Sequence, residues 1–267
     1  MRTIKSLLAV TLTAALALTS LHSAAAQPDA AKPTVVLVHG AFAESSSWNG
    51  VATRLLNQGY PVVAAANPLR GVKQDADYVA DIVEHTAGPV ILVGHSYGGA
   101  VITNAVHDNP KVKALVYVAA FAPDKGETAI ELSGRYPGGT LGPTLAAPVQ
   151  LDDGNKDLYI QQDKFGQQFA ADVPATESAL MAATQRPISE AALKEASGEP
   201  AWKKLPSWFI YGSADKNIPE AALKFMAERA GSKKTVTVQG ASHVVMTSNP
   251  EKVAELIVEA AQASSKG

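Results

Sequence analysis

The sequence predicts an α/β fold with a doubly wound, mainly parallel sheet and an inserted, mostly helical cap. The first observation is an alternation of short apolar strands with helices over residues 34–121, which resumes over residues 206–263. This alternation is typical of a parallel sheet built with right-handed crossovers. The second is that the alternation stops over residues 122–205, where no convincing strand is visible. The third is a glycine-flanked serine that lies between a predicted strand and a predicted helix.

The first 26 residues have the three parts of a secretory signal peptide. A charged start (Arg2 and Lys5) is followed by an apolar run from Leu7 to Leu18 and by Ala24-Ala25-Ala26, an A-x-A-like cleavage site. The pattern predicts cleavage before Gln27 and a secreted or periplasmic location. The run is short and is interrupted by threonine and serine, so we expect no stable membrane insertion.

Removing this segment leaves 267 − 26 = 241 residues with a formal charge of (23 − 2) − 25 = −4. That length is enough for one α/β domain with a full core and an insertion. We assign residues 27–121 and 206–267 to the core and 122–205 to the cap. The mildly acidic balance without basic runs predicts no nucleic-acid partner. There is no cysteine, so neither disulfides nor thiolate chemistry are expected. The sequence makes no prediction of the oligomeric state.

The core elements follow from apolar runs and from the residues that end them. Strands are predicted at 34–38, 61–66, 89–93 and 114–119, where β-branched and alanine residues dominate. Helices are predicted at 48–57, 74–85 and 100–106, with Ser47 as a plausible N-cap and Gly59 as a stop. After the cap, strands at 207–211 and 235–238 alternate with helices at 219–230 and 250–263. Within the cap, glycine and proline cluster at 136–148, and residues 158–196 look mostly helical.

The residues Gly94-His95-Ser96-Tyr97-Gly98-Gly99 fit the pattern G-x-S-x-G. A buried strand leads into them and a helix follows, which is the context that this motif needs. The flanking glycines allow a tight turn that exposes the hydroxyl of Ser96 at its tip. The N–H of Tyr97, at the helix N-terminus, then points to where an oxyanion would form.

Two further reactive side chains follow later strands. Asp215 comes after strand 207–211, and His243 comes after strand 235–238. Ligands of open parallel sheets bind beyond the carboxyl ends of the strands, so Ser96, Asp215 and His243 are predicted to meet there. The order Ser…Asp…His is that of one nucleophile-elbow fold. Histidine would take the serine proton, and the aspartate would fix the histidine tautomer.

With these residues the chain resembles the α/β-hydrolases of the small, capped serine-esterase type over nearly all of residues 34–263. The shared points are His39-Gly40, the elbow at 94–99, Gly212-x-x-Asp215 and Gly240-x-x-His243. The resemblance implies that Ala41 supplies a second oxyanion N–H beside Tyr97, with Phe42 flanking the pocket. Residues 27–33 are too few for the antiparallel strands that open the full-length fold, so the sheet is expected to be reduced at that edge.

Several residues compete for these roles. Asp124 also follows a strand, but Asp124-Lys125-Gly126-Glu127 resembles a helix-capping box, so Asp215 is the preferred acid. His39 and His95 are interpreted as buried residues, and His85 and His107 as surface residues. We assign Phe42, Phe165 and Trp202 to the substrate pocket, although the cap aromatics, which include Tyr159 and Phe169, are more often part of a cap core.

The predicted function is hydrolysis of small-molecule carboxylic esters through an acyl-enzyme on Ser96. Three alternatives stay open: cofactor-free perhydrolase or haloperoxidase chemistry, lyase chemistry on the same triad, and a non-catalytic small-ligand-binding protein on this scaffold. The chain resembles the branch with plant methyl esterases and hydroxynitrile lyases. The lyases carry a lysine and a threonine where Val244 and Ala41 stand here, which favours the esterase. No metal site and no cofactor are predicted. The sequence contains neither the H-E-x-x-H spacing of zinc-binding proteases nor a nucleotide-binding motif.

Overall fold

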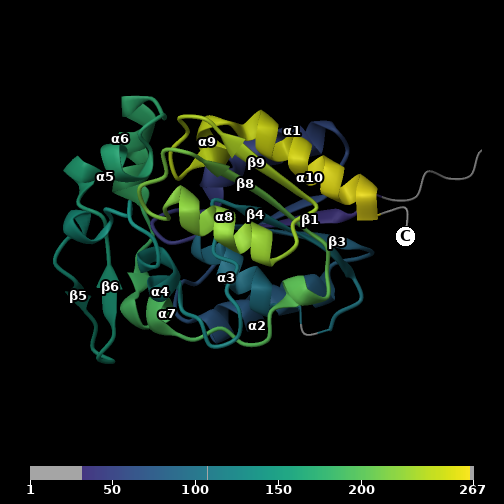
Figure 1. Ribbon diagram of the computed structural model, residues 1–267, viewed down its shortest axis with the longest axis horizontal. Coiled ribbons are helices and arrows are strands. Elements are labelled where there is room, and N and C mark those ends of the chain that lie inside the picture. The colour runs from purple at the N-terminus through teal and green to yellow at the C-terminus, as the bar shows by residue number, and fades with distance from the viewer. Residues whose placement is uncertain (1–31, 107, 265–267) are drawn as a thin grey trace, which may run out of the picture. The chain divides into compact units, whose positions relative to one another are not determined.

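The structure is a computed structural model that describes residues 32–106 and 108–264 (Figure 1). The predicted signal peptide lies outside the described residues, as does His107. Within the described ranges, no helix combines the length and the apolar character needed to cross a membrane.

A six-stranded sheet of order β2-β1-β3-β4-β8-β9 forms the centre of the fold. Every pairing in it is parallel, so the predicted doubly wound sheet is confirmed. Its strands are β1 (Thr34–Val38), β2 (Val62–Ala65), β3 (Val90–His95), β4 (Val112–Val118), β8 (Ser207–Gly212) and β9 (Lys234–Val238).

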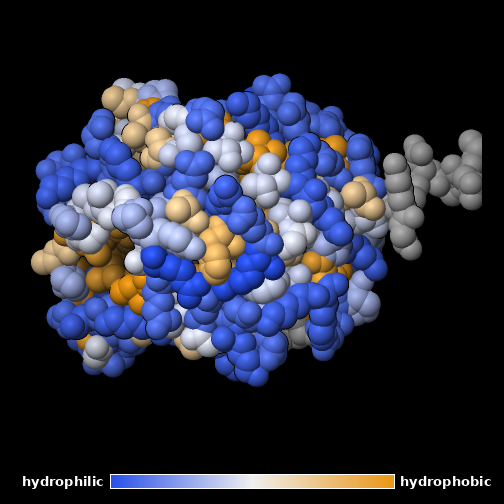
Figure 2. Space-filling view, viewed as in Figure 1, coloured by the Kyte–Doolittle hydropathy of each residue, from blue (hydrophilic) through white to orange (hydrophobic). Residues whose placement is uncertain are grey.

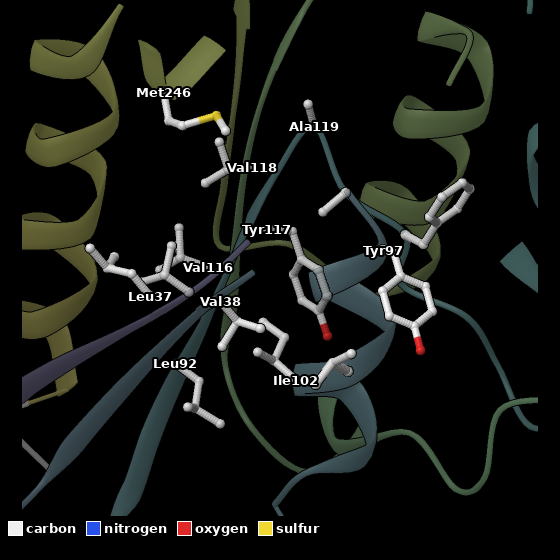
Figure 3. Packing of buried hydrophobic residues seen from close by; sticks show 14 of the residues in the cluster. Leu37, Val38, Leu92, Tyr97, Ile102, Val116, Tyr117, Val118, Ala119 and Met246 are labelled. Carbon is white, nitrogen blue, oxygen red and sulfur yellow. The ribbon is translucent and has the colours of Figure 1, made fainter. Parts of the chain in front are cut away.

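The central strands are continuous apolar runs because both faces of the sheet are covered. All residues of β1, β3 and β8 are buried. Side chains alternate between the two faces, as Val116 and Tyr117 of β4 do in Figure 3. Tyr117 stacks on Phe209 with 4.5 Å between ring centroids and shares a 2.9 Å hydrogen bond with Thr103. The polar tip of this buried tyrosine is therefore satisfied inside the core.

Helices cover both faces of the sheet (Figure 1). The first and last helices, α1 (Asn49–Asn57) and α10 (Pro250–Ser264), pack together on one face. On the other face, α2 (Val72–His85) packs against α3 (Tyr97–Asn104). Two more helices complete the core, α8 (Glu220–Arg229), which packs against β8, and the short α9 (Val245–Ser248). Sequence reasoning missed α9, whose four residues are too few to show a helical period.

The cap segment (residues 122–205) contains helices and, contrary to expectation, a small sheet. Its helices are α4 (Ala129–Gly134), α5 (Gln162–Phe169), α6 (Ala175–Thr184) and α7 (Glu190–Lys194). An antiparallel sheet of order β5-β6-β7 joins Val149–Gln150, Lys156–Leu158 and Ile188–Ser189. The prediction that the cap contains no strand is wrong. These strands have only two or three residues, and β6 carries two charged side chains, so they show neither alternation nor an apolar run.

The turn at Asp124 also differs from the expected helix cap. The carboxylate of Glu127 accepts the backbone N–H of Asp124 at 2.9 Å, but no helix begins there. The capping box lies four residues later, where Thr128 and Glu131 cap α4 reciprocally. Asp124 Oδ1 instead pairs with Lys203 Nζ at 2.6 Å. The two boxes have the same spacing, and only the second precedes a residue run that can continue as a helix.

Candidate active site

Ser96 lies at the sharp turn between β3 and α3. Its backbone has φ 54° and ψ −123°, a conformation that costs a non-glycine residue roughly 1–3 kcal/mol. Backbone bonds hold it there: Ser96 N donates to Val118 O at 3.2 Å, and Ser96 O accepts from Phe121 N at 3.1 Å. Among the described residues, Ser96 Oγ has no hydrogen-bond partner. The strained turn therefore holds the hydroxyl free of other bonds.

Glycines around the turn have no room for a side chain. A Cβ on Gly94 would lie 2.5 Å from Gly98 O, and one on Gly98 would lie 2.4 Å from Val38 O. A Cβ on Gly40 would lie 2.6 Å from the Cβ of Ser96 and 3.1 Å from Tyr97 N. These approaches explain the two glycines of the elbow and the glycine of His39-Gly40. They also place the loop after β1 directly beside Ser96.

His243 and Asp215 form a buried pair beside this elbow. His243 Nδ1 and Asp215 Oδ2 are 2.6 Å apart, and the side chains are 1% and 0% exposed. The other carboxylate oxygen, Asp215 Oδ1, accepts the N–H groups of Asn217 at 2.8 Å and Ile218 at 3.0 Å. Because a carboxylate accepts at Nδ1, the lone pair of His243 is at Nε2. The structure thus brings the predicted acid and base together.

His95 links the elbow to His243, and its ring is held neutral by burial. His95 Nε2 donates to His243 O at 3.2 Å, and the two ring centroids are 4.8 Å apart. Burial, and then the nearby His243, keep the pKa of His95 well below its usual value. Burial likewise lowers the pKa of His39 to about 4. Both rings are fully buried, as predicted, and His85 is exposed, as predicted.

Two backbone N–H groups at or near the elbow have no acceptor among the described residues. Tyr97 N is the first N–H of α3 and has no acceptor within the helix. Ala41 follows Gly40, and no described residue accepts its N–H. Asn67 Nδ2 fixes this loop by donating to His39 O at 2.9 Å, and the N–H of Phe42 (φ 60°) donates to Arg186 O of the cap segment at 3.0 Å.

The side chain of Tyr97 points away from the elbow and into the core. Its hydroxyl donates to Asp75 Oδ2 of α2 at 2.8 Å. Asp75 also accepts the N–H of Arg70, at 3.1 Å and 3.2 Å. Burial raises the pKa of both Asp75 and Tyr97. Figure 3 shows the Tyr97 side chain among the buried hydrophobic residues, and its hydrogen bond to Asp75 ties α3 to α2.

Aromatic rings of the cap segment lie against His243. Phe169, at the end of α5, lies 5.0 Å from the His243 ring and 6.1 Å from the ring of Phe42, measured between centroids. The ring of Phe165 packs against that of Phe169 at a tilt, with 4.9 Å between the ring centroids. Phe169 is thus nearer to the triad than Phe165, although the sequence-based assignment chose Phe165. Their spacing of four residues showed that they share a helix face but did not show which ring reaches the core.

The described contacts of Trp202 lie away from the triad, and its assignment to the substrate pocket stays a prediction. Its Nε1 donates to Pro123 O at 3.0 Å, and the guanidinium of Arg229 lies 5.6 Å from its ring. No ring contact joins it to His243, Phe169 or Phe42 within the described residues. Asp124 also lies outside the pair, because its carboxylate is bonded to Lys203.

Two hollows of the described chain lie apart from the triad. One, of about 1070 Å³, lies between α2, the end of α3 and residues 195–205. The other, of about 630 Å³, is lined by α5 residues and Lys216. Hydrophobic surface gathers in a depression over the cap elements at the left of Figure 2. The triad residues line neither of the two measured hollows, so the chemistry and not the cavity size locates the site.

Known proteins share most of this chain at low identity. It is 27% identical to an α-hydroxynitrile lyase of Arabidopsis thaliana, over 82% of this chain and 93% of that protein. It is 28% identical to a pyrethroid hydrolase of Sphingobium wenxiniae, over 86% and 88%. It is 26% identical to salicylic acid-binding protein 2 of Nicotiana tabacum, over 85% and 96%.

Solved structures share the fold. The crystal structure of polyneuridine aldehyde esterase matches with a TM-score of 0.74 at 18% identity, over 85% of this chain and 98% of that one. An extracellular α/β-hydrolase from a Paenibacillus species matches with a TM-score of 0.68 at 22% identity, over 85% and 98%. The model of the alpha/beta hydrolase family matches residues 35–256, so this chain belongs to the alpha/beta hydrolase family.

Proposed function

We propose that this protein is a serine hydrolase that cleaves carboxylic esters through an acyl-enzyme on Ser96. The observation that carries the proposal is the buried His243–Asp215 pair, with its 2.6 Å hydrogen bond, next to a strained serine elbow. The esterases and hydrolases among its relatives support the ester class. A small-molecule ester is the proposed substrate.

In this mechanism His243 is the base and Ser96 the nucleophile. His243 Nε2 takes the Ser96 proton as Oγ attacks the ester carbonyl carbon, and Asp215 stabilises the imidazolium that forms. The tetrahedral intermediate collapses, the C–O bond to the alcohol breaks, and His243 gives its proton to the leaving alkoxide. Water, deprotonated by His243, then hydrolyses the acyl-enzyme and restores Ser96. No hydrogen bond joins Ser96 Oγ to His243 among the described residues, and we expect this bond to form when substrate binds, because catalytic hydrogen bonds often tighten only in the complex.

The N–H groups of Ala41 and Tyr97 are the proposed oxyanion donors. Both are fixed before substrate arrives, one by the Gly40 contact with the elbow and the other by α3. Each such donor is worth about 3 kcal/mol of transition-state stabilisation.

Val244 favours the esterase over a lyase. This side chain follows His243, is fully buried and carries no proton donor. The lyases of the resembled branch place a lysine there. A perhydrolase activity would use the same three residues with peroxide as the acyl acceptor, and a non-catalytic binding protein would not need the Asp215–His243 pair.

A fluorophosphonate probe tests the proposal directly. We expect the wild-type protein to be labelled on Ser96 and to hydrolyse p-nitrophenyl esters in a panel of increasing acyl length. Ser96→Ala is expected to lose labelling and to reduce turnover by several powers of ten, with its stability nearly unchanged. A folded wild-type protein that is never labelled would refute the enzyme assignment. Mandelonitrile cleavage without ester cleavage would instead favour the lyase.

We also propose that the protein is exported and that its mature form begins near Gln27. The proposal rests on the charged, apolar and A-x-A-like parts of residues 1–26. Intact-mass measurement on protein recovered outside the cytoplasm tests it. Exported protein that retains Met1 or Arg2 would contradict the proposed cleavage.

A further inference from the structure

One cap helix contacts both loops that carry the acid and the base. The last two residues of α5 are Gln168 and Phe169. Phe169 packs on the His243 ring, and three residues later Asp172 accepts a hydrogen bond from Ser242, the neighbour of His243. Gln168 reaches the other loop, at Asp215. The cap segment therefore contacts the loop that carries His243 and the loop that carries Asp215.

Both polar atoms of the Gln168 side-chain amide make hydrogen bonds within the described chain. Its Nε2 donates to Asn217 Oδ1 at 2.9 Å and to Lys216 O at 3.0 Å. Its Oε1 accepts from Thr140 Oγ1 at 2.9 Å. The residue is 4% exposed. A buried amide is costly unless it is satisfied, and here both of its donors are spent on the residues that directly follow Asp215.

The same turn holds the Asp215 carboxylate through two backbone N–H groups. Asn217 N donates to Asp215 Oδ1 at 2.8 Å, and Ile218 N donates to the same atom at 3.0 Å. The opposite oxygen receives His243 Nδ1. A continuous set of hydrogen bonds thus runs from Gln168 through the turn at Lys216 and Asn217 to Asp215 and His243.

We infer that Gln168 is a positioning residue of the proposed triad. It fixes the turn after Asp215, and the turn aims the carboxylate at His243. The inference rests on the proposed function, because it assigns a role within that same site. Gln168 has no free polar group for a substrate, so its effect is expected on the chemical step and not on substrate binding.

Gln168→Met tests this role, with Gln167→Met as the matched control. Methionine has a similar volume but no amide, and Gln167 is the exposed neighbour on the same helix. After correction for active sites by fluorophosphonate titration, kcat of Gln168→Met is expected to fall about tenfold to a hundredfold, since small misplacements of reacting groups have effects of this size. KM is expected to stay within about twofold, because Gln168 is not expected to contact the substrate and a loss confined to the chemical step appears in kcat. Gln167→Met is expected to match the wild type.

Asn217→Ala removes one of the two acceptors of Gln168 Nε2, leaves the bond to Lys216 O, and keeps the backbone N–H that Asp215 needs. We expect a kcat loss no larger than that of Gln168→Met, and a double variant that is no worse than Gln168→Met, because both changes act on one path. The downfield resonance of the His243 Nδ1 proton should weaken or broaden in both.

Each failure points to a different assumption. If Gln168→Met does not fold, Asn217→Ala alone decides. If the wild type is active and either folded variant loses activity only in proportion to its titrated sites, with an unchanged His243 resonance, Gln168 has no positioning role. If the wild type itself is not labelled, the proposed function fails first.

Discussion

At the residue scale, Asp215 and Asp124 show how surroundings separate two side chains that the sequence places alike. Both follow strands of the core. Asp215 is bonded to His243 and to two backbone N–H groups, whereas Asp124 pairs with Lys203 across a partly exposed surface. The lysine lowers the pKa of Asp124, so this carboxylate is charged at neutral pH without taking part in the site.

This contrast makes a paired prediction. Asp215→Asn is expected to keep the fold and to lower kcat about 10⁴-fold, because the amide favours the wrong histidine tautomer. Asp124→Ala is expected to keep its activity and to change the free energy of unfolding by no more than about 1 kcal/mol, as for a surface ion pair. Ester turnover and urea unfolding on the same preparations measure both. An inactive Asp124→Ala beside an active Asp215→Asn would reverse the assignment.

The meeting of the acid and base could be predicted at this scale, but their support could not. The order of Ser96, Asp215 and His243 at strand ends follows from the pattern of strands, and the Asp215–His243 pair meets as expected. Gln168 and Phe169 reach the site through the packing of a cap helix, which no local pattern specifies. Residue type alone suggests Trp202 as a pocket residue, whereas in the structure its indole N–H donates a hydrogen bond to Pro123 O.

At the element scale, Gly212 shows how tightly the ends of β8 and β9 are joined. A Cβ on Gly212 would lie 2.1 Å from Ala241 O, and Ala214 N donates to the same oxygen at 3.0 Å. The backbone before Asp215 thus touches the backbone before His243. The two loops cannot move independently.

Gly212→Ala is therefore expected to push these loops apart. It should lower the free energy of unfolding by at least about 1–3 kcal/mol, the usual cost of forced overpacking, and should also lower kcat. Gly134→Ala is the matched control, because a Cβ there meets no atom within 4 Å and the residue lies in α4. The control is expected to be neutral or slightly stabilising. Thermal unfolding and ester turnover check both, and equal behaviour of the two variants would contradict the close-packing argument.

Elements with a strong sequence pattern could be predicted, and elements with a weak pattern could not. The core strands were predicted within about two residues because both-sided burial forces continuous apolar runs. The cap strands β5, β6 and β7 were missed because two or three residues are too few to show a strand pattern, and the contact that joins β6 to the core, Arg70 Nη1 with Asp157 at 2.6 Å, is distant in sequence. The two residues of this contact are 87 positions apart in the sequence, so no local sequence pattern indicates it.

At the scale of the whole molecule, two buried neutral histidines affect stability in acid. The unfolded chain binds a proton at His39 with the ordinary pKa of 6.5, whereas the folded chain does so only near pH 4. The unfolded state thus holds more protons between these values, so the free energy of unfolding falls as the pH drops from 6.5 to 4. His39 alone accounts for about 3 kcal/mol over this window, and the lowered pKa of His95 acts in the same direction.

His39→Gln, which does not titrate, is expected to flatten this pH dependence. Urea unfolding at several pH values between 7 and 4 measures it for the variant and the wild type. His85→Gln, at an exposed histidine of α2, is the control and should follow the wild-type curve. An equal slope for the wild type and His39→Gln would show that His39 is not buried as a neutral ring.

The pairing of β4 with β8 has a further consequence for how the chain reaches this state. Val118 pairs with Ile210, so 91 residues, among them the whole cap segment, lie between the two partners. Closing a loop of that length costs chain entropy before the pairing of the two strands can stabilise the fold. The Ser96 half can collapse from contacts nearby in sequence, while the Asp215–His243 half must wait for this closure. Recovery of esterase activity during refolding should therefore lag behind recovery of secondary structure, and nascent chains should stay inactive until the last helix has been made.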